Sequence, residues 1–225
     1  MSQPNQTPGQ NMDFQALLKP ARSGNLRTDL AAYLTTRGFP ATAGHCAAVG
    51  AGARRLAARF GEDPARAEAA GLLHDISAPI PDVERIATAE AWGLEVLAEE
   101  RAYPMIIHQK LSAVIAREAF GVTDAGVLSA IGCHTTLKAG AIRLDKVVFV
   151  ADKIAWDQPG DPPYLAEILA GVERSLDAAA FCYLDYLHQR QATLRVAHPW
   201  MLAAWGELYW QAISPGCAGG YRLPN

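Results

Sequence analysis

The feature of this sequence that most constrains its fold is a succession of alanine- and leucine-rich segments separated by glycine, proline and capping residues. Alanine and leucine favour helices, whereas the strand-favouring residues valine and isoleucine are less frequent. No segment alternates apolar and polar residues around an Asn-Gly or Asp-Gly turn, the pattern typical of a hairpin. We therefore predict an all-α fold.

Start and stop signals divide the chain into helices. Gly38 ends the first segment, Thr42 is placed to cap the second, and Gly61 ends that second segment. Asp63 caps the third segment, and Asp124 caps the segment through Cys133. The stretch WDQPGDPP at residues 156–163 predicts a loop. The expected helices cover residues 24–37, 42–59, 64–74, 82–91, 105–119, 124–133, 144–154, 164–190 and 199–213.

The length of the chain, 225 residues of which 50% are apolar, is sufficient for one sizeable core. We expect a single helical domain over residues 24–213. The polar, turn-rich start predicts a disordered or loosely packed leader over residues 1–23, and we expect a loose tail over residues 214–225.

Charge and composition argue against several classes of protein. The net charge of −3 provides no basic stripe, so no nucleic-acid partner is expected. No stretch approaches the roughly 20 apolar residues that cross a membrane, and a secretory signal is lacking. The four cysteines form no CxxC pair, which fits a reducing, cytoplasmic setting. A small anionic ligand stays compatible, because a bound metal ion can supply local positive charge.

The most informative pair of polar residues is His74-Asp75, at the end of a predicted buried helix. Imidazole and carboxylate side chains at adjacent positions can both reach one cation, and together they suit iron, manganese, zinc or cobalt. An ordinary polar helix end is the alternative for an isolated pair of this kind.

Two further residues have the environment of metal ligands. Asp152 lies in VVFVADK, directly after five apolar residues, where a buried carboxylate is costly unless a cation or hydrogen-bond donors compensate it. The alternatives are a salt bridge to Lys146 or Lys153, or a position on the surface. His45 is flanked by small residues that leave its ring space to point inward, although a hydrogen-bonded core histidine would have the same neighbours.

The other histidines divide into two groups. His108 follows the apolar YPMII and His134 precedes two threonines, so each could donate to a phosphate or complete a second metal site. For each taken alone, a structural role is the alternative. For His188 and His198 we favour a structural role.

The order His45, His74-Asp75, Asp152 resembles the metal-ligand order of the HD-domain phosphohydrolases. The closer resemblance is to the symmetrical bis(5'-nucleosyl)-tetraphosphatases of the YqeK type, and it extends over residues 37–205. The matching stretches are HCAAVGAGARRLAARFG, ARAEAAGLLHD, IIHQKLSAVIAREAFGV, IGCHTTLKAGAIRLDKVVFVADKI and VAHPWMLAA, of which the fourth is the most specific.

This resemblance implies an HD-domain helical bundle that binds a divalent metal ion and cleaves diadenosine tetraphosphate to two ADP. Iron is favoured by the resemblance, while manganese, cobalt, magnesium and zinc stay open. The implied metal ligands are His45, His74, Asp75 and Asp152, the implied catalytic residues are Asp75, His108 and His134, and the residues implied beside the substrate phosphates are His108, His134, Thr135 and Thr136.

Two departures from the family pattern concern basic residues. The family carries a lysine shortly after the His-Asp pair and a Glu-Pro-x-Arg motif after the ADKI segment. This chain has Ala78 at the first place and no arginine in the loop that follows ADKI. Lys138, Arg143 or Lys153 could contact the phosphates instead, and Trp156 could stack on a base. Lys153 and Trp156 are therefore predicted substrate contacts.

Other functions stay open from the sequence. One is a phosphohydrolase for another nucleotide, such as a nucleoside monophosphate; others are a nucleotide- or metal-binding regulatory module without catalysis, and a purely structural bundle. The Glu-Asp pair that resembles alarmone hydrolases is missing after His74-Asp75, as is the GYP signature of cyclic-dinucleotide phosphodiesterases. The sequence leaves the oligomeric state open, including a homodimer.

Overall fold

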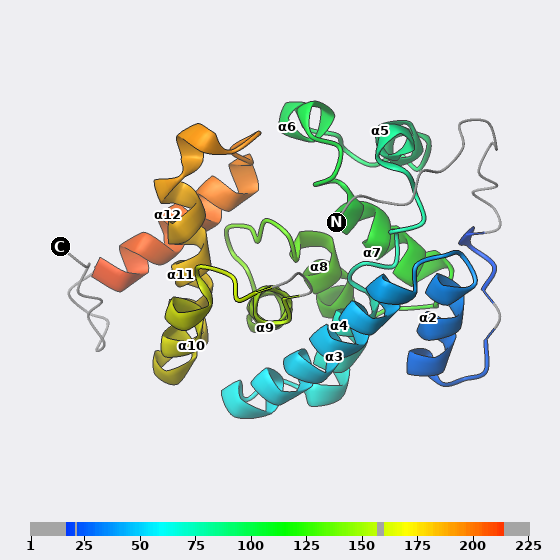
Figure 1. The fold of residues 1–225 in the computed structure, drawn as a ribbon, viewed down its shortest axis with the longest axis horizontal. Helices are drawn as coiled ribbons and strands as arrows, with labels where there is room; N and C mark the ends of the chain where they lie inside the picture. The colour runs from blue at the N-terminus through cyan, green and yellow to red at the C-terminus, as the bar shows by residue number, and fades with distance from the viewer. Residues whose placement is uncertain (1–16, 21, 157–159, 214–225) are drawn as a thin grey trace.

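The computed structural model describes residues 17–20, 22–156 and 160–213. Helices make up most of these ranges and no strand occurs in them, which confirms the predicted all-α fold (Figure 1). The helices are α2 (Leu26–Thr35), α3 (Pro40–Phe60), α4 (Pro64–Leu73), α5 (Asp82–Ala91), α6 (Ala98–Ala102), α7 (His108–Glu118), α8 (Ala125–Cys133), α9 (Arg143–Ile154), α10 (Leu165–Arg174), α11 (Leu176–Gln189), the 3-10 helix η1 (Gln191–Thr193) and α12 (Pro199–Ile213).

Several helix ends follow the capping residues that the sequence offers. Asp63 and Asp124 each accept hydrogen bonds from two backbone N–H groups in the first turns of α4 and α8. Gly61 ends α3 with φ of 70°, a left-handed conformation that glycine adopts without steric strain. The predicted ends at these three positions are confirmed.

Three predicted helix starts were wrong. α2 begins at Leu26 rather than at residue 24, because Asn25 caps it by accepting from the N–H of Thr28. α3 begins at Pro40 rather than Thr42, because the fixed φ of proline suits the first turn of a helix and no side-chain cap is needed there. α7 begins at His108 rather than at residue 105, because residues 104–107 form turns.

The predicted helix over residues 164–190 is two helices. Ser175 is extended between α10 and α11, with φ of −168° and ψ of 163°, and its side chain accepts from the N–H of Ala178. Gly171 allows the two helices to approach, because a Cβ there would lie 2.7 Å from the Cα of Ala179. The short helix α6 was also missed, since 5 residues are too few to show a helical period.

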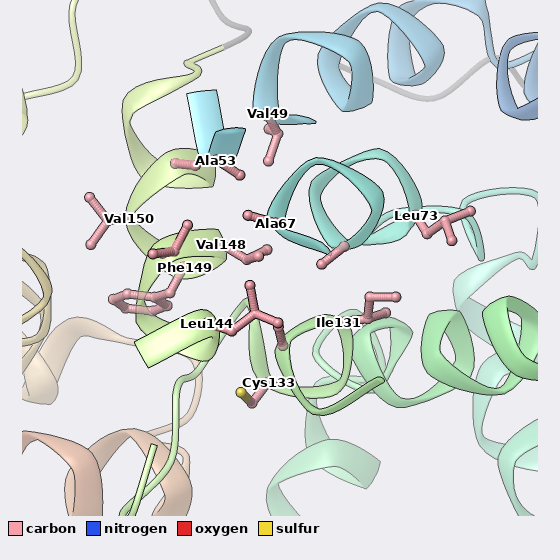
Figure 2. Close-up of a cluster of buried hydrophobic side chains, with 14 of the residues drawn as sticks. Val49, Ala53, Ala67, Leu73, Ile131, Cys133, Leu144, Val148, Phe149 and Val150 are labelled. Atoms are coloured by element: carbon pink, nitrogen blue, oxygen red, sulfur yellow. The ribbon is translucent and has the colours of Figure 1, made fainter. Parts of the chain in front are cut away.

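Helix α9 lies at the centre of the described fold, with α3, α4 and α8 on one side and α10 and α11 on the other (Figure 1). Val147, Val148 and Phe149 are fully buried. The VVFVA run is therefore apolar all round because other helices surround it. Figure 2 shows side chains from α3, α4, α8 and α9 gathered in one hydrophobic cluster.

Helices α3 and α4 approach each other through glycine. A Cβ built on Gly71 would lie 2.8 Å from the Cα of Gly50, so a larger residue would force the two backbones apart. This crossing brings His45 of α3 close to His74, the residue that follows the last turn of α4.

The described residues before α2 pack on the domain. Leu17 is buried in the core, and the guanidinium of Arg22 donates to the carbonyl of Phe120 at 2.6 Å. The rest of the predicted leader, residues 1–16 and 21, and the predicted tail, residues 214–225, lie outside the described residues. Among the helices described, none combines the length and apolar character needed to cross a membrane.

Candidate metal centre

Five helices bring four histidines and two aspartates into one cluster, which we call the His/Asp centre. Most of these residues lie at helix ends, where the chain turns and the side chain is not confined to a helix face. They are His45 of α3, His74 at the C-cap of α4 with Asp75 after it, His108 at the start of α7, His134 at the C-cap of α8, and Asp152 of α9.

One half of the His/Asp centre is formed by His45, His74 and Asp152. The Nε2 atom of His45 lies 3.1 Å from Oδ1 of Asp152 and 3.3 Å from Nε2 of His74. His74 Nε2 is in turn 3.6 Å from the same carboxylate oxygen. The donor atoms of these three residues all lie within 4.8 Å of one another, a spacing that one metal ion can span.

The other half is arranged around Asp75. Oδ1 of Asp75 lies 3.1 Å from Nε2 of His108 and 3.3 Å from Nε2 of His134, while its Oδ2 is 3.5 Å from Nε2 of His74. His74, Asp75 and His134 form a second group whose donor atoms lie within 4.8 Å of one another. His74 therefore belongs to both groups, and the aspartate lies where two cations could share it.

Backbone hydrogen bonds fix the tautomer of three of the histidines. A carbonyl oxygen can only accept, so a ring nitrogen that faces it carries the proton, and the other ring nitrogen presents a lone pair. Metal-binding histidines have the same arrangement. The Nδ1–H groups donate to carbonyls three residues earlier: His74 to Gly71 at 2.8 Å, His134 to Ile131 at 2.8 Å and His108 to Met105.

The Nε2 atoms that carry these lone pairs face one another in the pair His108 and His134. The Nε2 atoms of His108 and His134 are 3.0 Å apart. Burial lowers the pKa of His134 to about 4, so this ring is neutral near pH 7 and has no Nε2 proton to place between them. His45 has a further orphan atom, since its buried Nδ1 has no hydrogen-bond partner among the described residues. The donor set therefore fits a bound cation.

The shifts of two pKa values indicate the same requirement for positive charge. Burial acts to lower the pKa of His74, but Asp75, Cys46 and Asp152 together outweigh it and raise that pKa well above the usual value. Burial likewise acts to raise the pKa of Asp75, but His74, His108 and His134 together hold it well below its usual range. A proton on His74 supplies the charge that a metal ion can supply in its place.

The His/Asp centre is most exposed at Asp75. The side chains of His74 and His134 are 0% and 2% exposed, whereas that of Asp75 is 26% exposed. Water and a substrate can therefore reach the centre at Asp75.

The buried carboxylate of Asp152 has two kinds of partner. Its Oδ1 faces His45, while its Oδ2 accepts from Nζ of Lys153 at 2.5 Å. Lys146 lies elsewhere and pairs with Asp177. The salt bridge that the sequence offered as an alternative to metal binding is thus present on one oxygen, and the other oxygen still faces the histidines.

The two threonines after His134 have different surroundings. Oγ1 of Thr135 lies 3.1 Å from Nε2 of His134, at the edge of the His/Asp centre. Thr136 is buried, and its hydroxyl lies within hydrogen-bond distance of the amide of Gln109. Gln109 Oε1 also accepts from the N–H of Thr135. Gln109 could not be predicted as a site residue from its local sequence, because a glutamine inside a helix is common.

A cavity of about 430 Å³ adjoins the centre, which it meets at the threonines. Its size is within the range of sites that enclose small molecules. Its walls are mainly apolar and aromatic, with a few polar side chains. The lining residues include Tyr103, Met105, Ile106, Thr135, Leu187 and Arg195.

The residues proposed to replace the missing basic groups have partners in the protein. Lys138 donates to Ser129 at 2.8 Å, and Arg143 donates to the carbonyl of Gly61 at 3.1 Å. Trp156 is 37% exposed, and its ring meets Tyr164 edge-on.

The two histidines expected to be structural lie outside the cluster. His188 stacks on Trp205, with ring centroids 3.5 Å apart. His198 is buried, accepts from the N–H of Trp200 through Nδ1, and places Nε2 3.6 Å from Oε1 of Glu100.

Comparisons with known proteins agree with this geometry. The chain is 48% identical over 135 residues to the "Uncharacterized protein in pepC 5'region" of Lactococcus lactis subsp. cremoris, covering 60% of this chain and 68% of that protein. It is 34% identical over 101 residues to the symmetrical bis(5'-nucleosyl)-tetraphosphatase of Bacillus subtilis, covering 44% of this chain and 53% of that enzyme. The chain thus spans about half the length of that tetraphosphatase.

A solved structure shares the fold. It is described as a predicted HD superfamily hydrolase involved in NAD metabolism from Clostridium acetobutylicum, and it superposes with a TM-score of 0.74 at 24% identity. The match covers 81% of this chain and 96% of that chain. Residues 42–157, more than half of the sequence, match the model of the HD domain. The chain therefore belongs to the HD domain family.

Proposed function

We propose that this protein hydrolyses a phosphoanhydride bond in a nucleotide with the help of divalent metal ions, and that its preferred reaction is the symmetrical cleavage of diadenosine tetraphosphate to two ADP. The observation that carries the metal-dependent part is the convergence of histidine Nε2 atoms on the carboxylates of Asp75 and Asp152. The similarity of this chain to the symmetrical tetraphosphatase of Bacillus subtilis supports the choice of substrate.

The His/Asp centre offers two positions for a cation. His45, His74, Asp75 and Asp152 would hold one ion, and Asp75, His108 and His134 would hold a second. Four imidazoles suit iron, manganese, cobalt or zinc better than magnesium, and iron is our first choice. Such ions supply positive charge to phosphoryl oxygens and lower the pKa of a water ligand.

The protein side chains have separate tasks in this proposal. Asp75, the most exposed member of the centre, accepts a hydrogen bond from the attacking water and orients it. The hydroxyl of Thr135 donates to a phosphoryl oxygen. His108 and His134 act as ligands rather than as donors to phosphate, because their Nδ1–H groups already bind carbonyls.

The reaction changes two bonds. The water oxygen forms a bond to one of the two central phosphorus atoms, and the bond from that phosphorus to the central bridging oxygen breaks. The water proton leaves to solvent, and the bridging oxygen departs as the terminal oxygen of ADP. Both products are therefore ADP.

Chromatographic analysis of products tests this function. The metal-loaded protein and its His74→Ala variant are incubated with diadenosine tetraphosphate, with mononucleotides and with a general phosphodiester. We expect ADP as the sole product from diadenosine tetraphosphate and near-complete loss of turnover in the variant. Turnover of a mononucleotide alone would reject the tetraphosphatase assignment, and absence of turnover with bound metal would indicate a regulatory binding module.

A further inference from the structure

The wall of the cavity beside the His/Asp centre includes an arginine, Arg195. Arg195 lies in the segment between η1 and α12 and lines the cavity. Its guanidinium carbon lies 5.0 Å from the centre of the Tyr103 ring, which covers one face of the group. Among the residues that the structure describes, no carboxylate pairs with Arg195.

The other basic side chains around the site differ in this respect. Lys153 is bound to Asp152 and Lys110 to Glu100, each through a carboxylate. Lys138 lies 4.0 Å from Asp145 and bonds to a serine hydroxyl. The negative charge of these carboxylates offsets the positive charge that the lysines could offer to a ligand. Arg195 is thus the cation of the cavity wall that has neither an ion pair nor a hydrogen bond to another described residue.

The cavity wall combines two kinds of chemistry. Thr135 lies beside the His/Asp centre, where a phosphate is expected. Met105, Ile106 and Leu187 provide apolar wall, which suits a base or a ribose. A guanidinium with one face on an aromatic ring still directs its N–H groups outward in a fork, and this geometry matches two oxygens of a phosphate.

We propose that Arg195 binds a phosphate adjacent to the one that is attacked, and so makes the site selective for nucleotides that carry more than one phosphate. This inference rests on the proposed function.

Calorimetric titration of the manganese-loaded protein with ADP, AMP and adenosine tests this selectivity by binding alone. We expect the wild-type protein to bind ADP more tightly than AMP. Loss of a charge-assisted hydrogen bond in Arg195→Ala should weaken ADP binding about tenfold and change adenosine binding by less than about twofold. Arg195→Lys should keep part of the ADP affinity, since it retains the charge without the fork.

Arg190 provides a matched control. It is also an exposed arginine over a tyrosine ring, 3.9 Å from the centre of Tyr186, and it donates to the carbonyl of that residue, but it does not line the cavity. Arg190→Ala should bind ADP as the wild type does. Melting temperatures of all variants, measured alongside, check that the exposed substitutions leave the fold intact.

Wild-type ADP affinity in Arg195→Ala would overturn the proposal, as would an equal loss for adenosine and ADP or a failure of the metal-loaded wild type to bind ADP. If the wild type binds ADP through Arg195 but hydrolyses no nucleotide, the proposed catalytic function fails while the role of Arg195 in phosphate binding stands. Binding and turnover thus separate the two claims.

Discussion

Hydrogen bonds to nearby backbone carbonyls fix the tautomers of three histidines in the His/Asp centre. His74, His108 and His134 all donate from Nδ1 to the carbonyl three residues earlier. His74 and His134 follow the last turns of α4 and α8, where carbonyls lack an N–H partner from the helix, so these rings also satisfy the backbone. One hydrogen bond therefore caps the turn and leaves Nε2 as a metal donor. His108 instead begins α7, and the carbonyl of Met105 also accepts from its backbone N–H.

The residue types of the centre could be predicted from the sequence, but their tautomers could not. The apolar run before Asp152 and the adjacent His74-Asp75 pair indicated buried groups in need of a cation. The direction of each ring depends on which carbonyls a turn leaves unpaired, and this follows from the folded backbone. Gln109 and Arg195 were missed because neither residue type is unusual in its local sequence.

Single ligand substitutions test whether the centre holds two ions. His45 faces Asp152, whereas His108 faces Asp75 and His134 on the other side. We expect His45→Ala and His108→Ala each to remove about one of two bound ions per chain, since each deletes a ligand of one position. Elemental analysis after dialysis measures the ratio. One ion in the wild type, with His108→Ala unchanged, would show a single metal position.

At the scale of helices, the approach of α3 to α4 decides how close His45 and His74 can come. We expect Gly71→Ala to lower the free energy of unfolding by about 1–3 kcal/mol, because the added methyl group would overlap the backbone of Gly50. The same change should weaken metal binding, since it moves the two histidines apart. Chemical denaturation and metal titration measure the two effects.

Gly52→Ala is the control on α3. A Cβ there would lie 3.6 Å from the Cβ of Ala151, an ordinary contact, and alanine favours the helix over glycine. This variant should be as stable as the wild type or slightly more stable. Equal stability of Gly71→Ala and Gly52→Ala would mean that the close crossing has no energetic importance.

The ion pair between Arg66 of α4 and Asp124, the N-cap of α8, makes the stability of the fold depend on pH. Hydrogen bonds from Arg66 lower the pKa of Asp124 to about 2, from an ordinary value of 3.8. A carboxyl whose pKa is lower in the folded state stabilises the fold above the unfolded value, and this contribution is lost as the pH falls through both values. Stability from this pair should therefore disappear between about pH 4 and pH 2.

Asp124→Asn tests this linkage, because asparagine still caps the helix but carries no charge. Urea unfolding at a series of pH values should show a steeper loss of stability on acidification in the wild type than in the variant. Parallel curves for the two proteins would contradict a stabilising ionic pair at this position.

Local sequence preferences were sufficient to predict some helix ends but not others. Asp63 and Asp124 could be predicted as caps because capping depends on the neighbouring three residues. The break at Ser175 could not, since the leucine- and alanine-rich sequence on both sides favours one continuous helix. Packing of Gly171 against Ala179 folds α10 back on α11 instead.

At the scale of the whole molecule, one core organises both the fold and the centre. Helix α9 is surrounded by other helices, so its inward carboxylates, Asp145 and Asp152, have to be compensated within the protein. The class of the fold followed from composition and helix signals. The arrangement of the helices around α9 depends on contacts between distant segments, which the local pattern of residues does not specify.

The same architecture predicts that metal and folding are coupled. Removal of metal with a chelator leaves lone pairs and carboxylates facing one another in a buried site, so we expect a lower melting temperature that returns when manganese is added. Asp75→Ala should show little response to either treatment, because it lacks the residue shared by both proposed metal positions. Identical melting of chelated and metal-loaded wild type would contradict this coupling.

Anomalous diffraction from crystals of the metal-loaded protein tests the central claim most directly, because it locates cations without reference to activity. We predict anomalous peaks at about 2.0–2.2 Å from the Nε2 atoms of His45, His74, His108 and His134 and from the carboxylates of Asp75 and Asp152. A protein that crystallises with this fold in saturating metal but shows no peak within reach of these atoms would contradict the assignment of the His/Asp centre.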